Sequence, residues 1–92
     1  MKKFLIEVPH GAGKHACDNA IKVFMQTGSH FLTHAEWGCL DGEHKAWIIV
    51  ETENKDEARY IVPPLFRPTA KITQLTTFSA EDILKSDKIH QG

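Results

Sequence analysis

The sequence predicts an α+β domain whose strands and helices follow the order βαββαβ. Three observations favour this class. Apolar residues alternate with others over residues 4–8, apolar side chains recur at helical spacing over residues 14–27, and the dipeptide Asp41-Gly42 separates two segments of strand character. With 92 residues the chain has room for one core, so we expect a single domain over residues 1–92.

The first strand is expected to end at Pro9, because Phe4, Ile6 and Val8 alternate along it and proline stops regular pairing. Glycines follow, and a helix is expected over residues 14–27, with Gly28 as its C-terminal stop. The apolar face of this helix comprises Cys17, Ala20, Ile21, Phe24 and Met25.

A hairpin is predicted next, with strands over residues 31–40 and 43–52 joined by a two-residue type I′ turn at Asp41-Gly42. This register pairs Cys39 with His44 and Glu36 with Trp47. One face of the hairpin should meet the helices; it carries Phe31, Ala35, Trp37, Cys39, Ala46, Ile48 and Val50. The open face should carry Leu32, His34, Glu36, Trp47 and Ile49.

The second half of the chain predicts a short helix, a strand and a terminal helix. Asn54 and Glu57 have capping-box spacing, and the helix they start should end before Pro63-Pro64. Residues 71–78 alternate and are rich in threonine, which favours a fourth strand. Ser79 and Asp82 indicate the cap of a short helix, followed by a frayed tail to Gly92.

Composition and charge exclude several classes of protein. A net charge of -1 disfavours a nucleic-acid partner, and the longest apolar run, residues 46–50, is too short to cross a membrane. No signal peptide is indicated, so we expect a cytoplasmic protein in which Cys17 and Cys39 are reduced thiols. The small core favours a homodimer.

The element order is that of ferredoxin-like domains, and the segment Pro64-Leu65-Phe66-Arg67-Pro68 is similar to the loop before the last strand of muconolactone isomerases. The chain also resembles small uncharacterised and metal-binding families of the dimeric α+β barrel superfamily. This resemblance implies a four-stranded antiparallel sheet in the order 4-1-3-2, two helices on one face and a second subunit's sheet on the other. No isomerase motif allows a catalytic residue to be carried over.

The first candidate site is the open face. There His34 and Glu36 would lie about 7 Å apart on one strand surface as a catalytic acid-base pair. Trp47, Ile49 and Leu32 would bind a small apolar or aromatic molecule between two sheets, as in an isomerase or a cofactor-free oxygenase. The alternative is that these polar groups only satisfy one another, or water, at a dimer interface.

The second candidate site is a metal site at the strand end beside Asp41-Gly42. In the sheet order that the resemblance implies, His10, Cys39 and His44 would meet there, near the helix that begins with His15 and Cys17. Such side chains bind zinc, nickel or copper. The protein would then be a metal-binding or ligand-sensing module without turnover. The alternative is that the thiols are simply buried and the imidazoles lie on the surface, with no metal bound. His30 and His34 would stand about 13 Å apart in a strand, which excludes a shared ion.

Overall fold

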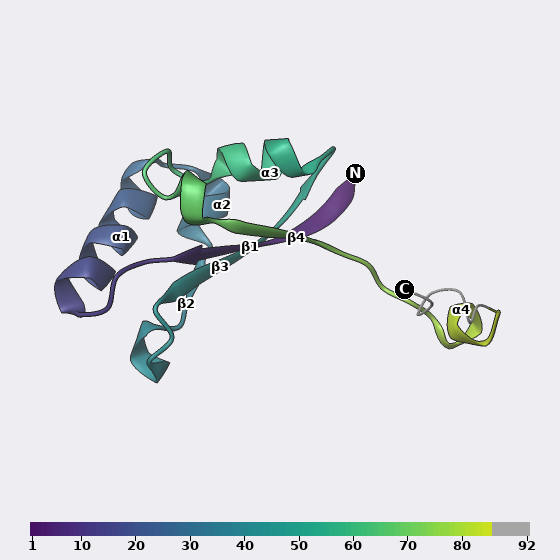
Figure 1. Cartoon of the computed structure of the whole chain (residues 1–92). Helices are drawn as coiled ribbons and strands as arrows, with labels where there is room; N and C mark the ends of the chain where they lie inside the picture. The colour runs from purple at the N-terminus through teal and green to yellow at the C-terminus, as the bar shows by residue number, and fades with distance from the viewer. Residues whose placement is uncertain (86–92) are drawn as a thin grey trace.

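A four-stranded antiparallel sheet in the order β2-β3-β1-β4 organises the computed structural model, which describes residues 1–85 (Figure 1). Read from β4, this is the order 4-1-3-2 that the resemblance implies. The strands are β1 (Lys2–Pro9), β2 (Glu36–Trp37), β3 (Lys45–Thr52) and β4 (Lys71–Leu75). The helices are α1 (Lys14–Gln26), α2 (His30–Thr33), α3 (Lys55–Ile61) and α4 (Ala80–Lys85), with 3₁₀ turns η1 (Cys39–Asp41) and η2 (Arg67–Thr69).

The core lies between one face of the sheet and helices α1, α2 and α3, all of which cover that face (Figure 1). Alternate residues of β1 and β3 point into it, as the period of a strand requires. The first strand and the first helix are confirmed. The buried cluster comprises Phe4, Ile6, Val8, Phe24, Leu32, Ala46, Ile48, Val50, Ala58, Val62, Ala70 and Ile72.

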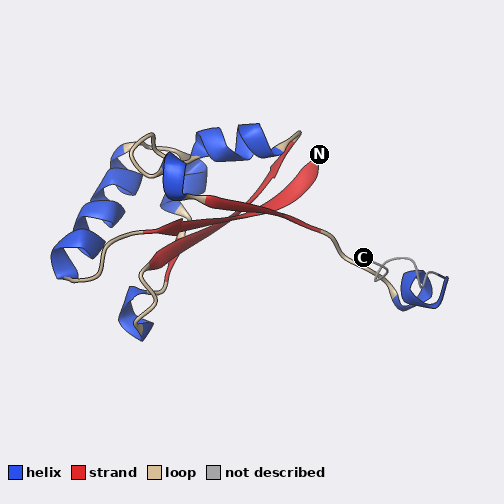
Figure 2. Ribbon diagram, in the orientation of Figure 1, coloured by secondary structure: helices blue, strands red, loops and turns tan. Residues whose placement is uncertain are grey.

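The predicted hairpin is only partly correct. Its register is right where β2 exists, because Glu36 pairs with Trp47 and Trp37 pairs with Ala46. The strand over residues 31–40 is wrong, since helix α2 and turn η1 occupy residues 31–33 and 39–40 and only the two residues of β2 are strand (Figure 2). A helical turn at α2 lets the chain cross from α1 to the sheet edge while it places Leu32 in the core at 1% exposure.

The two-residue turn at Asp41-Gly42 is also wrong. A type I′ turn needs positive φ at both central residues, yet only Gly42 has it, with φ 82°. The connection instead begins at Gly38, whose N–H donates to the carbonyl of Lys45 at 3.1 Å. A Cβ at Gly38 would lie 2.6 Å from the Trp47 ring, so this close approach requires glycine.

The remaining elements follow the prediction closely. Asn54 accepts the Glu57 N–H at 2.9 Å at the start of α3, as a capping box requires. Strand β4 ends at Leu75 rather than at residue 78, because Leu75 already pairs with Lys3 and β1 has almost no residues left beyond it. The predicted tail to Gly92 lies outside the described residues.

Helix α4 and the second face of the sheet complete the arrangement. Helix α4 lies away from the sheet at the end of an extended segment (Figure 1). The second face, which we call the open face, carries the β1 and β3 residues that alternate with the core, including Leu5, Glu7, Trp47 and Ile49. None of the helices in residues 1–85 has the length and apolar character needed to span a membrane.

Candidate metal centre

Four side chains that carry metal-ligand atoms converge at one end of the sheet. The ligand atoms of His10, Cys17, Cys39 and His44 all lie within 4.8 Å of one another, and none of these residues is exposed. We call this group the His/Cys cluster. It contains the three residues predicted as ligands, together with Cys17.

The two histidines are held opposite each other by the sheet. The last β1–β3 pair is Pro9 with Lys45, and the N–H of His10 then donates to the carbonyl of His44 at 3.0 Å. This bond continues the antiparallel ladder by one residue beyond the strands. The expectation that His10 and His44 lie close together is therefore confirmed, with ring centroids 5.8 Å apart.

The two cysteines reach the cluster from different elements. Cys17 lies in the first turn of α1, where its N–H donates to the carbonyl of Gly13 at 3.1 Å. It shares the buried face of α1 with Ala20 and Phe24, so its side chain points toward the sheet. Cys39 begins turn η1 directly after Gly38, and this turn brings its Sγ to 3.2 Å from His10 Nε2.

Cys17 and Cys39 form a disulfide bond, so the expectation of two free thiols is wrong. The cysteines are 22 residues apart in the chain, with Cα atoms 6.9 Å apart. Sequence spacing gave no sign of this pairing, because the approach depends on the position of α1 against the sheet and on the path of η1. The same two sulfur atoms are therefore both a disulfide and half of the His/Cys cluster.

The protonation of His10 follows from its contacts. Its Nδ1 lies 2.9 Å from the carbonyl oxygen of Gly11, which can only accept a hydrogen bond, so Nδ1 carries a proton. In the neutral imidazole, Nε2 then presents a lone pair. That lone pair faces Cys39 Sγ at 3.2 Å and Cys17 Sγ at 3.8 Å. A disulfide has no S–H to donate, so it leaves this acceptor without a donor.

His44 adds a second nitrogen without a partner. Its Nδ1 is buried and makes no hydrogen bond within residues 1–85. Buried polar atoms are normally satisfied, and an orphan atom calls for an explanation. A cation bound between the imidazoles and the sulfurs would satisfy Nδ1 of His44 if it coordinated that atom. If it coordinated Nε2 instead, it would fix the orientation of the ring.

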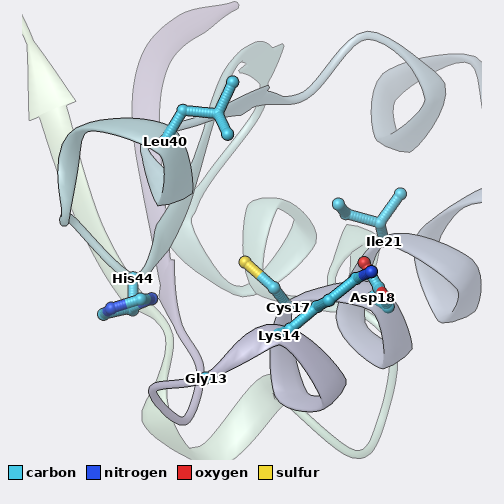
Figure 3. A pocket seen from close by; sticks show the side chains of 7 residues that line it. All are labelled: Gly13, Lys14, Cys17, Asp18, Ile21, Leu40 and His44. Atoms are coloured by element: carbon cyan, nitrogen blue, oxygen red, sulfur yellow. The ribbon is translucent and has the colours of Figure 1, made fainter.

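A pocket of about 420 Å³ adjoins the cluster (Figure 3). The Cys17 sulfur points into it, between His44 and Leu40. Ile21 and Leu40 give it apolar walls, and Lys14 and Asp18 lie on the α1 side. Cys39 does not line the pocket. Molecules that approach from the pocket therefore reach the Cys17 sulfur first.

The open-face site predicted from the sequence loses part of its geometry. His34 is not beside Glu36 on a strand, because it ends helix α2 and its Nδ1 lies 2.8 Å from the carbonyl of His30. Leu32 is buried in the core instead of facing outward. Glu36, Trp47 and Ile49 do share the open face, where the Trp47 indole donates to Glu7 at 3.3 Å.

The exclusion of the His30/His34 pair also rested on the wrong element. His30 begins helix α2 and His34 follows its last residue, so their ring centroids lie 4.3 Å apart instead of the roughly 13 Å expected in a strand. Both residues are exposed, and no third ligand joins them in a group within residues 1–85. The pair is a weak competitor of the His/Cys cluster.

Cys17 was not in the predicted ligand set, although a signal for it existed. Cys17, Ala20 and Phe24 share one helical face, so the pattern already placed the thiol on the side of α1 that meets the sheet. His15 is exposed and lies outside the cluster. No family model, curated protein or solved structure matches the chain, and the assignment of this site therefore depends on its geometry.

Proposed function

We propose that this protein is a metal-binding domain in which the His/Cys cluster, with both cysteines reduced, holds one zinc ion. The observation that carries the proposal is the convergence of two imidazoles and two sulfurs within 4.8 Å from four separate points of the chain. Two cysteines and two histidines form one of the common ligand sets of structural zinc sites. The group contains no carboxylate, which disfavours calcium and magnesium.

The distances around His10 support this assignment. With zinc bonds of about 2.3 Å to sulfur and 2.0–2.1 Å to nitrogen, tetrahedral ligand atoms lie roughly 3.3–3.8 Å apart. His10 Nε2 lies 3.2 and 3.8 Å from the two sulfurs. The sulfur pair must separate for an ion to enter, and any pair near the 4.8 Å limit of the group must come closer.

The charge of the two thiolates and the hydrogen bond behind His10 favour the same ion. Two thiolates balance the charge of Zn²⁺, so the bound site adds no net charge to a partly buried region. The contact from His10 Nδ1 to the Gly11 carbonyl is the kind of outer contact that orients a zinc-bound imidazole. Four protein ligands fill a tetrahedral zinc ion, which fits a structural or sensing site better than a catalytic one.

The location of the site explains why a small domain would use it. An ion in the cluster would tie the end of β1, the first turn of α1, turn η1 and the start of β3 to one another. Small domains commonly add such a link to a limited hydrophobic core. Within this proposal we place the protein in the cytoplasm, where thiols stay reduced.

A second candidate function is supported by the open face. Ile49 is 62% exposed on it, beside Trp47 and Leu5, and no helix in residues 1–85 covers this side of the sheet. The resemblance to ferredoxin-like dimeric α+β barrels suggests that a second copy covers this patch and encloses a small apolar or aromatic molecule. Sedimentation of the wild type and of Trp47→Glu tests this: a dimer that Trp47→Glu dissociates supports it, and a wild-type monomer contradicts it.

The zinc proposal is tested with protein purified without an affinity tag and reduced with a phosphine. Titration with Zn²⁺ should give one equivalent bound, and Co²⁺ should give the absorption of a tetrahedral thiolate complex. The double variant Cys39→Ser with His44→Ala should lose both signals. The double variant His30→Ala with His34→Ala is the matched control and should keep them. Absence of binding by the reduced wild type, or its retention in the first variant, would contradict the proposal.

A further inference from the structure

We infer that the His/Cys cluster is a thiol-controlled switch: the Cys17–Cys39 disulfide and the zinc-bound dithiol exclude each other, and a low-molecular-weight thiol entering the adjoining pocket converts the first into the second. This inference rests on the proposed zinc site. It extends that proposal by naming the chemistry that opens the site and the sulfur at which it begins.

The two states exclude each other for a geometric and an electronic reason. A disulfide holds its sulfurs about 2.05 Å apart, whereas two sulfurs bound to one tetrahedral zinc ion lie about 3.8 Å apart. The ligand form of cysteine is also the thiolate, which a disulfide lacks. The Cys17–Cys39 bond therefore leaves only the two imidazoles of the cluster able to bind an ion.

The pocket determines which sulfur is attacked. The Cys17 sulfur points into it and Cys39 does not line it. Lys14 and Asp18 both lie at the pocket and offer one positive and one negative charge to the carboxylates and the ammonium group of a thiol such as glutathione, while Ile21 and Leu40 contact its apolar part. Gly13 and Lys14, at the N-terminus of helix α1, line the pocket, so the positive end of the helix dipole also faces an approaching anion.

The departing sulfur has a suitable neighbour. When a thiolate attacks Cys17, the electron pair of the S–S bond leaves on Cys39. Cys39 Sγ lies 3.2 Å from His10 Nε2, closer than Cys17 Sγ at 3.8 Å. The lone pair on His10 Nε2 is therefore positioned to share a zinc ion with the Cys39 thiolate.

The reaction balances with two molecules of thiol. The first thiolate, RS⁻, forms an R–S–S bond to Cys17 and releases the Cys39 thiolate. A second RS⁻ attacks the R-bearing sulfur of this mixed disulfide, releasing the Cys17 thiolate and RSSR. The protein disulfide gains two electrons, two RS⁻ lose them, and Zn²⁺ then binds both protein thiolates. Reaction of the zinc form with RSSR is the reverse and expels the ion.

The first experiment measures zinc binding and thiol state together. Full-length, untagged protein is equilibrated in glutathione buffers of different ratios of [GSH]² to [GSSG], with and without Zn²⁺, and its disulfide content is measured by mass spectrometry after thiol alkylation. The oxidised protein should bind no stoichiometric zinc. At a zinc concentration of 100 times its Kd for the dithiol form, the midpoint ratio should shift about 100-fold in favour of the dithiol.

This measurement separates the inference from the proposed function. If the reduced protein binds no zinc, the zinc site itself is wrong. If the reduced protein binds zinc but the oxidised protein binds it equally well, or the midpoint ratio does not respond to zinc, the site stands and the switch is overturned.

The second experiment tests the point of entry with single-cysteine proteins. Cys39→Ser leaves Cys17, which should react with glutathione disulfide faster than Cys39 does in Cys17→Ser. Lys14→Glu should slow reduction of the wild-type disulfide by glutathione several-fold more than reduction by uncharged mercaptoethanol. Lys22→Glu, the same charge change at an exposed position of α1, is the control. Faster reaction at Cys39, or equal effects of the two lysine variants, would overturn the assignment of the pocket.

Discussion

Two close histidine pairs among residues 1–85 differ in what brings them together. His30 and His34 lie one helical turn apart, with ring centroids at 4.3 Å, whereas His10 and His44 are joined across the sheet with centroids at 5.8 Å. The first pair is closer, yet it is exposed and no third ligand within residues 1–85 joins it. The second pair is partly buried, has a His44 nitrogen without a hydrogen-bond partner in that same range, and has two sulfurs beside it.

This comparison shows that proximity alone does not make a metal site. A ligand needs a lone pair that nothing else uses, and an ion needs several such ligands around one point. The His/Cys cluster meets both conditions through contacts between distant parts of the chain. The His30/His34 pair fails the second condition, because no third ligand within residues 1–85 joins it.

The largest expected effect is the stabilisation of the reduced protein by zinc. At a zinc concentration 100 times the Kd, binding to the folded state alone raises the free energy of unfolding by about 2.7 kcal/mol. Urea unfolding with and without zinc should show this gain in the wild type and in the variant lacking both His30 and His34. The variant Cys39→Ser with His44→Ala should gain nothing. An equal gain in all three proteins would remove the distinction between the two histidine pairs.

The same distinction explains how far the sequence could predict the site. The sheet order that the resemblance implies pairs β1 with β3, and this pairing places His10 opposite His44 whatever the loops between them do. The proximity of these residues was therefore predictable. The disulfide was not, because it depends on the path of η1 and on how α1 packs against the sheet.

The predicted pair of His34 and Glu36 on the open face is wrong because that prediction depended only on a local pattern. His34 and Glu36 share a face only if residues 31–36 are all extended, and burial of Leu32 by a helical turn overrides that local pattern. The Asp41-Gly42 signal was similarly local. It marked a turn correctly, but the close contact of Gly38 with Trp47 selected a longer connection.

A second, smaller effect is expected from Gly38→Ala. The added Cβ would lie 2.6 Å from the Trp47 ring and 2.8 Å from the Glu43 carbonyl oxygen, so the hairpin must shift. Overpacking of this kind costs about 1–3 kcal/mol, and the shift displaces the adjacent Cys39. Both the urea midpoint and the zinc affinity should fall.

Gly28→Ala is a control with a different cause. A Cβ there meets nothing within 4 Å, although φ of 70° makes any side chain strained. It should lower stability without lowering zinc affinity. A loss of affinity in both glycine variants would show that general destabilisation, rather than displacement of Cys39, weakens the site.

The smallest expected effect concerns another contact made within one turn, the cap of α4. The Ser79 N–H donates to Asp82 at 2.9 Å and the Asp82 N–H donates to the Ser79 hydroxyl at 3.1 Å. The backbone hydrogen bond from Ser79, followed by the hydrogen bond from its side chain, holds the pKa of Asp82 below its usual value. The lowered pKa means that the folded helix prefers the ionised carboxylate.

The stabilisation of α4 by Asp82 should therefore be complete above the usual aspartate pKa of about 3.9 and should be lost as the pH falls through the lowered value. An NMR titration of the Asp82 carboxyl carbon and of the amides of residues 80–85 measures both changes. Ser79→Ala should raise the pKa of Asp82 and reduce the helical shifts. Ser29→Ala is the matched control, because Ser29 stands at the start of α2 without a side-chain cap bond and should change neither. Because Ser79→Ala keeps the backbone N–H of residue 79, an unchanged Asp82 titration would show that this N–H alone holds the carboxylate and that the Ser79 hydroxyl contributes nothing.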